Sequence, residues 1–133
     1  MVHDDQERQT MFELKIIDHF AAAHQLRMVA EKCENLHGHN WKVEAYVAGK
    51  QLNKAGVLLD FGELKEYLSQ IMNTLDHKFL NELKFLGDGN PSSENLARYI
   101  ATELQKCFKG DKIHVTRVAV WESENACATY IVE

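Results

Sequence analysis

The chain lacks the cysteine content of a disulfide-rich protein, and its number of cysteines is odd. It contains three in 133 residues, namely Cys33, Cys107 and Cys127. Three cysteines cannot all pair within one chain, and no apolar signal segment is found at the N-terminus. We therefore expect a reduced, cytoplasmic protein.

Long apolar runs and basic clusters are also missing. No stretch approaches the roughly 20 apolar residues of a transmembrane helix, so no membrane partner is expected. Lys and Arg total 15 against 20 Asp and Glu, which gives a formal net charge of -5. With no basic cluster in the chain, no nucleic-acid partner is expected. An anionic substrate would have to be held by local positive groups or by a metal.

The composition is otherwise that of a globular protein, with 45% hydrophobic and 26% charged residues. No internal repeat interrupts the chain, and its length suits a single domain over residues 1–133. The polar residues 1–10 are expected to form a loose tail.

Two histidines stand one residue apart, His37 and His39, at the start of an alternating pattern. The apolar residues Trp41 and Val43 continue the same alternation, which is typical of a strand. On a strand both imidazoles point to one face, whereas on a helix they would point to nearly opposite sides.

A third histidine, His24, lies in an upstream segment that also alternates. Three imidazoles on one face form the set that catalytic zinc sites use, with the fourth position left for water or substrate. The sequence therefore predicts a zinc site at His24, His37 and His39, although imidazoles also accept iron, copper or nickel. The alternative is that two of these histidines are ordinary surface residues.

Three other positions are candidates for chemistry. Cys33 lies between the histidine segments and would act either as a thiolate base or as a fourth zinc ligand that closes the site. Asp76 and His77 lie at the end of a predicted helix. They would either act as a proton relay or simply end the helix without a chemical role. Glu122 ends a predicted strand, either exposed or bound to a planar donor edge through two parallel hydrogen bonds.

Alternation predicts strands over about 12–24, 37–48, 113–122 and 126–132, and helical spacing predicts helices over about 61–76 and 93–109. The segment 78–90 between the helices is expected to be irregular. Asp60 is a typical N-cap for the first helix, and Ser92 or Ser93 for the second. The order β-β-α-α-β-β predicts an α+β domain, with a four-stranded antiparallel sheet and both helices on one face. Its open edges favour pairing between subunits.

Several motifs together resemble the 6-pyruvoyl-tetrahydropterin synthase family. They are Ala22-Ala23-His24, Cys33-x-x-x-His37-Gly38-His39-Asn40, Leu59-Asp60-Phe61-Gly62-Glu63-Leu64-Lys65, Leu75-Asp76-His77 and Asn90-Pro91-Ser92-Ser93-Glu94. Cys33 stands four residues before His37, the spacing of the family's 6-carboxy-5,6,7,8-tetrahydropterin synthases of queuosine biosynthesis, whereas animal-type 6-pyruvoyl enzymes place it six before.

The resemblance implies a tunnelling fold, in which three four-stranded sheets form a barrel and two trimers stack as a hexamer with sites at the subunit interfaces. It implies zinc at the three histidines, Cys33 as base, and Asp76 with His77 as a relay. Glu122 would anchor a pterin ring, and Ser92 and Ser93 would contact it. The implied reaction converts 7,8-dihydroneopterin triphosphate to 6-carboxytetrahydropterin, acetaldehyde and triphosphate.

Glu34 leaves the substrate assignment open, because it stands where folate-pathway variants of the family carry a glutamate instead of the cysteine. Those variants form 6-hydroxymethyl-dihydropterin, so this chain could support either outcome, or Glu34 could be a solvated loop residue. Two further hypotheses are the formation of a 6-pyruvoyl product and a non-catalytic, zinc-stabilised oligomer that binds pterins.

Overall fold

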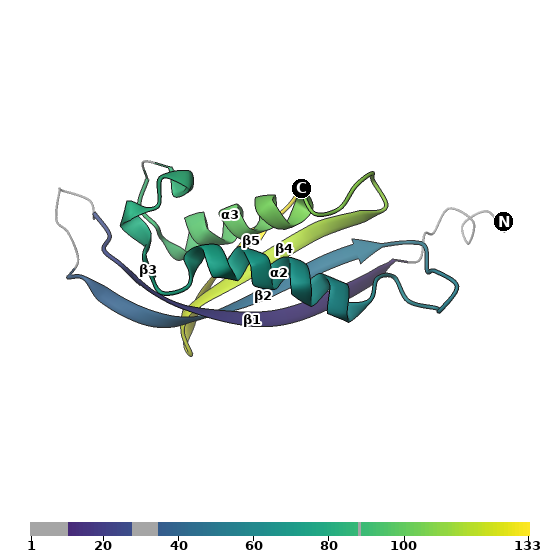
Figure 1. Ribbon diagram of the computed structural model, residues 1–133, viewed down its shortest axis with the longest axis horizontal. Coiled ribbons are helices and arrows are strands. Elements are labelled where there is room, and N and C mark those ends of the chain that lie inside the picture. Colours follow the sequence, from purple (N-terminus) through teal and green to yellow (C-terminus); the bar gives the residue numbers. More distant parts are fainter. Residues whose placement is uncertain (1–10, 28–34, 88) are drawn as a thin grey trace, which may run out of the picture.

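The computed structural model describes residues 11–27, 35–87 and 89–133. A long twisted sheet carries two helices on one face (Figure 1). The elements are β1 (Phe12–His24), β2 (His37–Gly49), α2 (Phe61–Leu75), β3 (Lys78–Phe79), the 3-10 helices Leu80–Glu82 and Lys84–Leu86, α3 (Ser93–Gln105), β4 (Ile113–Ser123) and β5 (Ala126–Ile131). The predicted α+β class is confirmed.

The sheet has one strand more than predicted. Its order is β3-β1-β2-β4-β5, and the four predicted strands pair antiparallel, but β3 adds to β1 in parallel. His77 turns the chain out of α2 with a positive φ of 58°, and its N–H donates to the carbonyl of Ala21. The next two residues therefore run along β1. Two residues are too few to show an alternation, so the expectation of an irregular segment was wrong here.

The pairing of β1 with β2 places the predicted metal ligands on one face of the sheet. Phe20 lies opposite Trp41, and His24 lies opposite His37, in a register without a bulge. This face continues beneath α2 and α3, where it forms the core. The core is formed by buried residues of the sheet face and of the two helices, which include Ile16, Val43, Ala45, Val47, Leu64, Leu68, Leu96, Ile100, Val118 and Val120.

Both helices begin where the sequence predicts. The Asp60 carboxylate accepts a hydrogen bond from the Gly62 N–H at 3.1 Å, and the Ser92 hydroxyl accepts one from the Asn95 N–H at 3.1 Å. Ser92, not Ser93, is therefore the cap of α3. Within the described part of the chain, neither helix has the length and apolar character needed to cross a bilayer.

Trp41 joins the core to the histidines, and its truncation is expected to be strongly destabilising. The side chain is fully buried, stacks on Phe20 with ring centroids 5.6 Å apart, and donates its Nε1–H to the Ala22 carbonyl at 3.1 Å. Trp41→Ala should lower the free energy of unfolding by about 3–5 kcal/mol, because the cavity cannot fully collapse. Urea denaturation measures this change.

Trp41→Phe is the matched variant, since it keeps an aromatic ring and removes the N–H donor. We expect it to cost about 1–2 kcal/mol. An alanine variant as stable as wild type would contradict the assignment of Trp41 to the core.

Candidate metal centre

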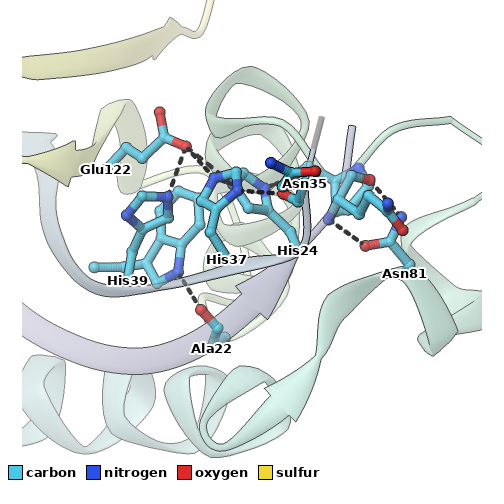
Figure 2. Close-up of polar contacts among 10 residues, drawn as sticks. Ala22, His24, Asn35, His37, His39, Asn81 and Glu122 are labelled. Atoms are coloured by element: carbon cyan, nitrogen blue, oxygen red, sulfur yellow. Dashed lines mark hydrogen bonds and ion pairs between the residues drawn. The ribbon is translucent and has the colours of Figure 1, made fainter. Parts of the chain in front are cut away.

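Four potential metal ligands meet at one end of the sheet. His24 ends β1, His37 and His39 begin β2, and Glu122 lies near the end of β4; one ligand atom from each lies within 4.8 Å of all the others. Figure 2 shows the Glu122 carboxylate directed at the three imidazoles. The predicted histidine set is thus brought together. Glu122 joins it, although the sequence analysis placed Glu122 at the substrate ring.

The contacts within this group are short. The Nε2 atoms of His24 and His37 are 3.0 Å apart. One oxygen of Glu122, Oε1, lies 2.9 Å from His24 Nε2, 3.0 Å from His39 Nε2 and 3.6 Å from His37 Nε2. His24 is fully buried, whereas the Glu122 side chain is 33% exposed. The group is therefore closed beneath and open at the carboxylate.

Backbone carbonyls fix the protonation of two of the rings. His24 Nδ1 lies 2.8 Å from the Pro91 carbonyl, and His37 Nδ1 lies 2.7 Å from the Asn35 carbonyl. Because a carbonyl can only accept, we assign the proton of each neutral ring to Nδ1. Each Nε2 then presents a lone pair to the centre. Such outer partners commonly orient metal-binding histidines.

This arrangement fits a cation better than a hydrogen bond. Two Nε2 lone pairs that face each other at 3.0 Å repel one another unless a positive charge lies between them. His39 Nε2 is buried and has no hydrogen-bond partner among the described residues, because its close contact with Glu122 is not directed as a hydrogen bond. Burial lowers the pKa of His39 against the opposing Glu122 charge, which favours the neutral ligand form. The residues present therefore fit a metal ion.

Glu122 is positioned from the opposite face of the sheet. Its neighbour Trp121 donates its indole N–H to Glu44 at 2.6 Å, and Lys15 donates to the same carboxylate at 3.3 Å. Burial alone would raise the pKa of Glu44, but these donors lower it overall, so Glu44 stays ionised. With Trp121 held on one face, the alternation of β4 directs Glu122 to the other face, toward the histidines.

Asparagine side chains hold the segment that follows His24. Asn81 accepts from the Gln25 N–H at 2.8 Å and donates to the Gln25 carbonyl at 2.6 Å. Asn90 accepts from the Arg27 N–H at 2.7 Å and donates to the Arg27 carbonyl at 2.6 Å. Asn81 was not singled out from the sequence, and Asn90 was noted only as part of a family motif, because asparagine in an irregular segment is equally typical of a turn.

The predicted relay residues form a pair of their own. His77 Nδ1 lies 2.9 Å from Asp76 Oδ2, and Asp76 Oδ1 accepts from the Ala21 N–H at 2.8 Å. Asp76 is thereby attached to β1 three residues before His24. The His77 side chain is 83% exposed, so its imidazole is open to solvent or to a neighbouring subunit.

The predicted pterin contacts, Ser92 and Ser93, directly follow a residue that contacts the centre. Ser92 follows Pro91, whose carbonyl binds His24, and its hydroxyl is engaged as the helix cap. Ser93 is the first residue of α3. Cys33 and Glu34 lie outside the described residues, so their predicted roles stay predictions.

The ionisation of Asp76 should make stability depend on pH. The Ala21 N–H, and then His77, hold the pKa of Asp76 below its usual value. A carboxyl group whose pKa is lower in the folded protein than in the unfolded chain stabilises the fold at pH values above its unfolded pKa. This contribution is lost as the pH falls through its folded pKa. Asp76→Asn should therefore be less stable than wild type at pH 7, and the difference should shrink toward pH 3.

Urea denaturation at several pH values measures this difference. Asp111→Asn is the control, because it removes an exposed carboxylate for which no hydrogen bond is found among the described residues. A constant difference between Asp76→Asn and wild type from pH 7 to pH 3 would count against the assignment.

Comparison with known proteins identifies the family of the chain. The family model for 6-pyruvoyl tetrahydropterin synthase matches residues 13–133. The chain belongs to this family. A "6-carboxy-5,6,7,8-tetrahydropterin synthase" of Synechocystis is 39% identical over 92 residues, covering 65% of this chain and 70% of the relative. This agrees with the resemblance seen in the motifs.

Another relative carries a different name. A "Dihydroneopterin monophosphate aldolase" of Pyrococcus furiosus is 35% identical over 103 residues, covering 77% of this chain and 82% of the relative. Among solved structures, the 6-pyruvoyl tetrahydropterin synthase of Caenorhabditis elegans superposes with a TM-score of 0.81 and 24% identity, covering 95% of this chain and 99% of that one. The latter match shows that the family members share the fold.

Proposed function

We propose that this protein is a zinc-dependent lyase that converts 7,8-dihydroneopterin triphosphate to 6-carboxy-5,6,7,8-tetrahydropterin, acetaldehyde and triphosphate in queuosine biosynthesis. The convergence of three imidazoles and a carboxylate at one end of the family fold carries the proposal. The name of the Synechocystis relative and the spacing of Cys33 from His37 support this reaction over the others of the family.

The chain's residues would divide the work. His24, His37 and His39 would hold zinc, which when bound makes the hydroxyls of the substrate's side chain more acidic. Cys33 would take protons from that side chain. Asp76 would keep His77 oriented as the second proton carrier, which agrees with their 2.9 Å contact. The proposed reaction needs the metal, the base and the second proton carrier in one place.

The pterin ring would be held by the remaining residues. Glu122 would accept two parallel hydrogen bonds from the ring's donor edge. Ser92 and Ser93 would add contacts from the start of α3. The Ser92 hydroxyl serves as the α3 cap in the structure, through the Asn95 N–H. Ser93 therefore keeps its hydroxyl for a ligand more readily than Ser92 does.

We further propose that the protein works in the cytoplasm as a hexamer built from two trimers. The exposed edge strand β5 and the exposed side chain of His77 support an assembly in which neighbouring subunits complete the site.

A second candidate reaction is side-chain cleavage that releases 6-hydroxymethyl-dihydropterin. The Pyrococcus relative, an aldolase by name, favours it, as does the presence of Glu34 beside Cys33. Formation of a 6-pyruvoyl product from the same substrate is the third candidate reaction within the family.

Mass spectrometry of the products formed from 7,8-dihydroneopterin triphosphate by the zinc-loaded protein tests the proposal. The expected products are 6-carboxytetrahydropterin and acetaldehyde. Finding only 6-hydroxymethyl-dihydropterin or a 6-pyruvoyl product would reject the queuosine-pathway reaction and keep the metal site. An intact substrate, together with unfolding on chelation, would instead indicate a non-catalytic zinc-stabilised oligomer.

A further inference from the structure

Glu122 occupies a position that its expected role at the pterin ring does not explain. Its Oε1 contacts two imidazole Nε2 atoms at 2.9 and 3.0 Å. Figure 2 shows its other oxygen directed away from the histidines. One oxygen thus points into the centre, as a monodentate metal ligand does, and the other faces outward.

The spacing of the donor atoms matches a four-coordinate site. Zinc bonds of about 2.0–2.1 Å in a tetrahedron place neighbouring ligand atoms about 3.3 Å apart. Of the six separations, those between Glu122 Oε1 and the three Nε2 atoms are 2.9, 3.0 and 3.6 Å, and that between His24 Nε2 and His37 Nε2 is 3.0 Å. The two separations that involve His39 and another histidine are within 4.8 Å. Glu122 therefore completes a closed set of four ligands in the protein without substrate.

The strand around Glu122 permits this side chain to change partners. The register of β4 with β5 shifts between Trp121 and Ser123, so Glu122 lies at an irregularity of the ladder. Such irregularities redirect side chains next to active sites. With a third of its side chain exposed, Glu122 is also more accessible than the fully buried His24.

We infer that Glu122 is the fourth metal ligand in the substrate-free protein, and that a bound pterin ring takes this carboxylate away from the metal. This inference rests on the proposed function, because the ring is the expected second partner of Glu122. The exchange frees the fourth position only when a pterin is present, so the substrate's hydroxyls meet an open metal and solvent does not.

The first experiment measures metal affinity without any pterin. Zinc affinity from competition with a chelator should fall at least about tenfold in Glu122→Gln, since changes even beyond the direct ligands cost 10–100-fold. Glu124→Gln is the matched control, because it removes the same charge from an exposed residue in the turn that follows β4. Equal zinc affinity in Glu122→Gln and wild type overturns the inference.

The second experiment follows the visible spectrum of the cobalt-substituted protein while pterin is added. Pterin is chosen as the probe because it lacks the side-chain hydroxyls that could bind the metal themselves. The wild-type and Glu124→Gln spectra should shift on saturation, whereas the Glu122→Gln spectrum should differ from the start and stay unchanged.

The two ideas fail in distinguishable ways. If the fluorescence of pterin is quenched on binding to the wild-type protein but the cobalt spectrum stays unchanged, the ligand exchange is rejected and the pterin site stands. If pterin does not bind the wild-type protein at all, the proposed function is rejected together with the exchange.

Discussion

Replacing His37 with alanine is expected to remove the metal and abolish turnover. His37 is the most exposed of the three histidines, at 33%, so its truncation should disturb the core less than truncation of the fully buried His24. Loss of one of three imidazoles should weaken metal binding more than about 100-fold, since even outer-shell changes reach that size. Metal content after gel filtration and turnover of dihydroneopterin triphosphate measure the effect.

His114→Ala is the matched control for this variant. His114 is an exposed histidine on β4, in the register opposite Ala48, at the end of the sheet remote from the metal centre. We expect full metal content and activity in His114→Ala. Retained metal in His37→Ala at the level of this control would refute the assignment of the centre.

Replacing Cys33 with alanine is expected to reduce turnover by about 10²–10⁴-fold while zinc is retained. The loss is that of a positioned proton-transfer group. Zinc should remain because the described centre already offers four ligand atoms, from His24, His37, His39 and Glu122. Turnover and zinc content of the same preparation test both statements.

Two further variants interpret this result. Cys127→Ala removes an exposed thiol on β5 and should change neither quantity. Loss of zinc in Cys33→Ala, but not in Cys127→Ala, would show that Cys33 is a metal ligand and not the base. A Glu34→Ala variant with unchanged products would count against a folate-type role for Glu34.

The histidine set could be predicted because it depends only on the period of a strand. His37 and His39 lie two residues apart, and His24 ends the preceding strand on the matching face, so pairing of consecutive strands is enough to bring them together. The starts of the two helices at Asp60 and Ser92 could be predicted for the same reason. Capping depends on a local pattern, since it involves residues two or three positions apart.

The rest of the site depends on contacts that no local pattern reveals. Glu122 reaches the centre because β4 pairs with β2, a strand that lies more than 70 positions earlier in the chain. The carbonyls of Pro91 and Asn35 that orient two histidines belong to the backbone, which carries no sequence signal. The strand β3 follows from one positive φ at His77, a conformation that is uncommon in residues other than glycine.

The separation of the four ligands along the chain would set an order for metal loading during synthesis. The three histidines lie on one hairpin, so they leave the ribosome together, whereas Glu122 follows His24 by 98 positions. A nascent chain could therefore hold a metal loosely on the β1–β2 hairpin before the helices exist. Tight, selective capture would wait until β4 docks, so the choice of metal would be made late, after most of the domain has folded.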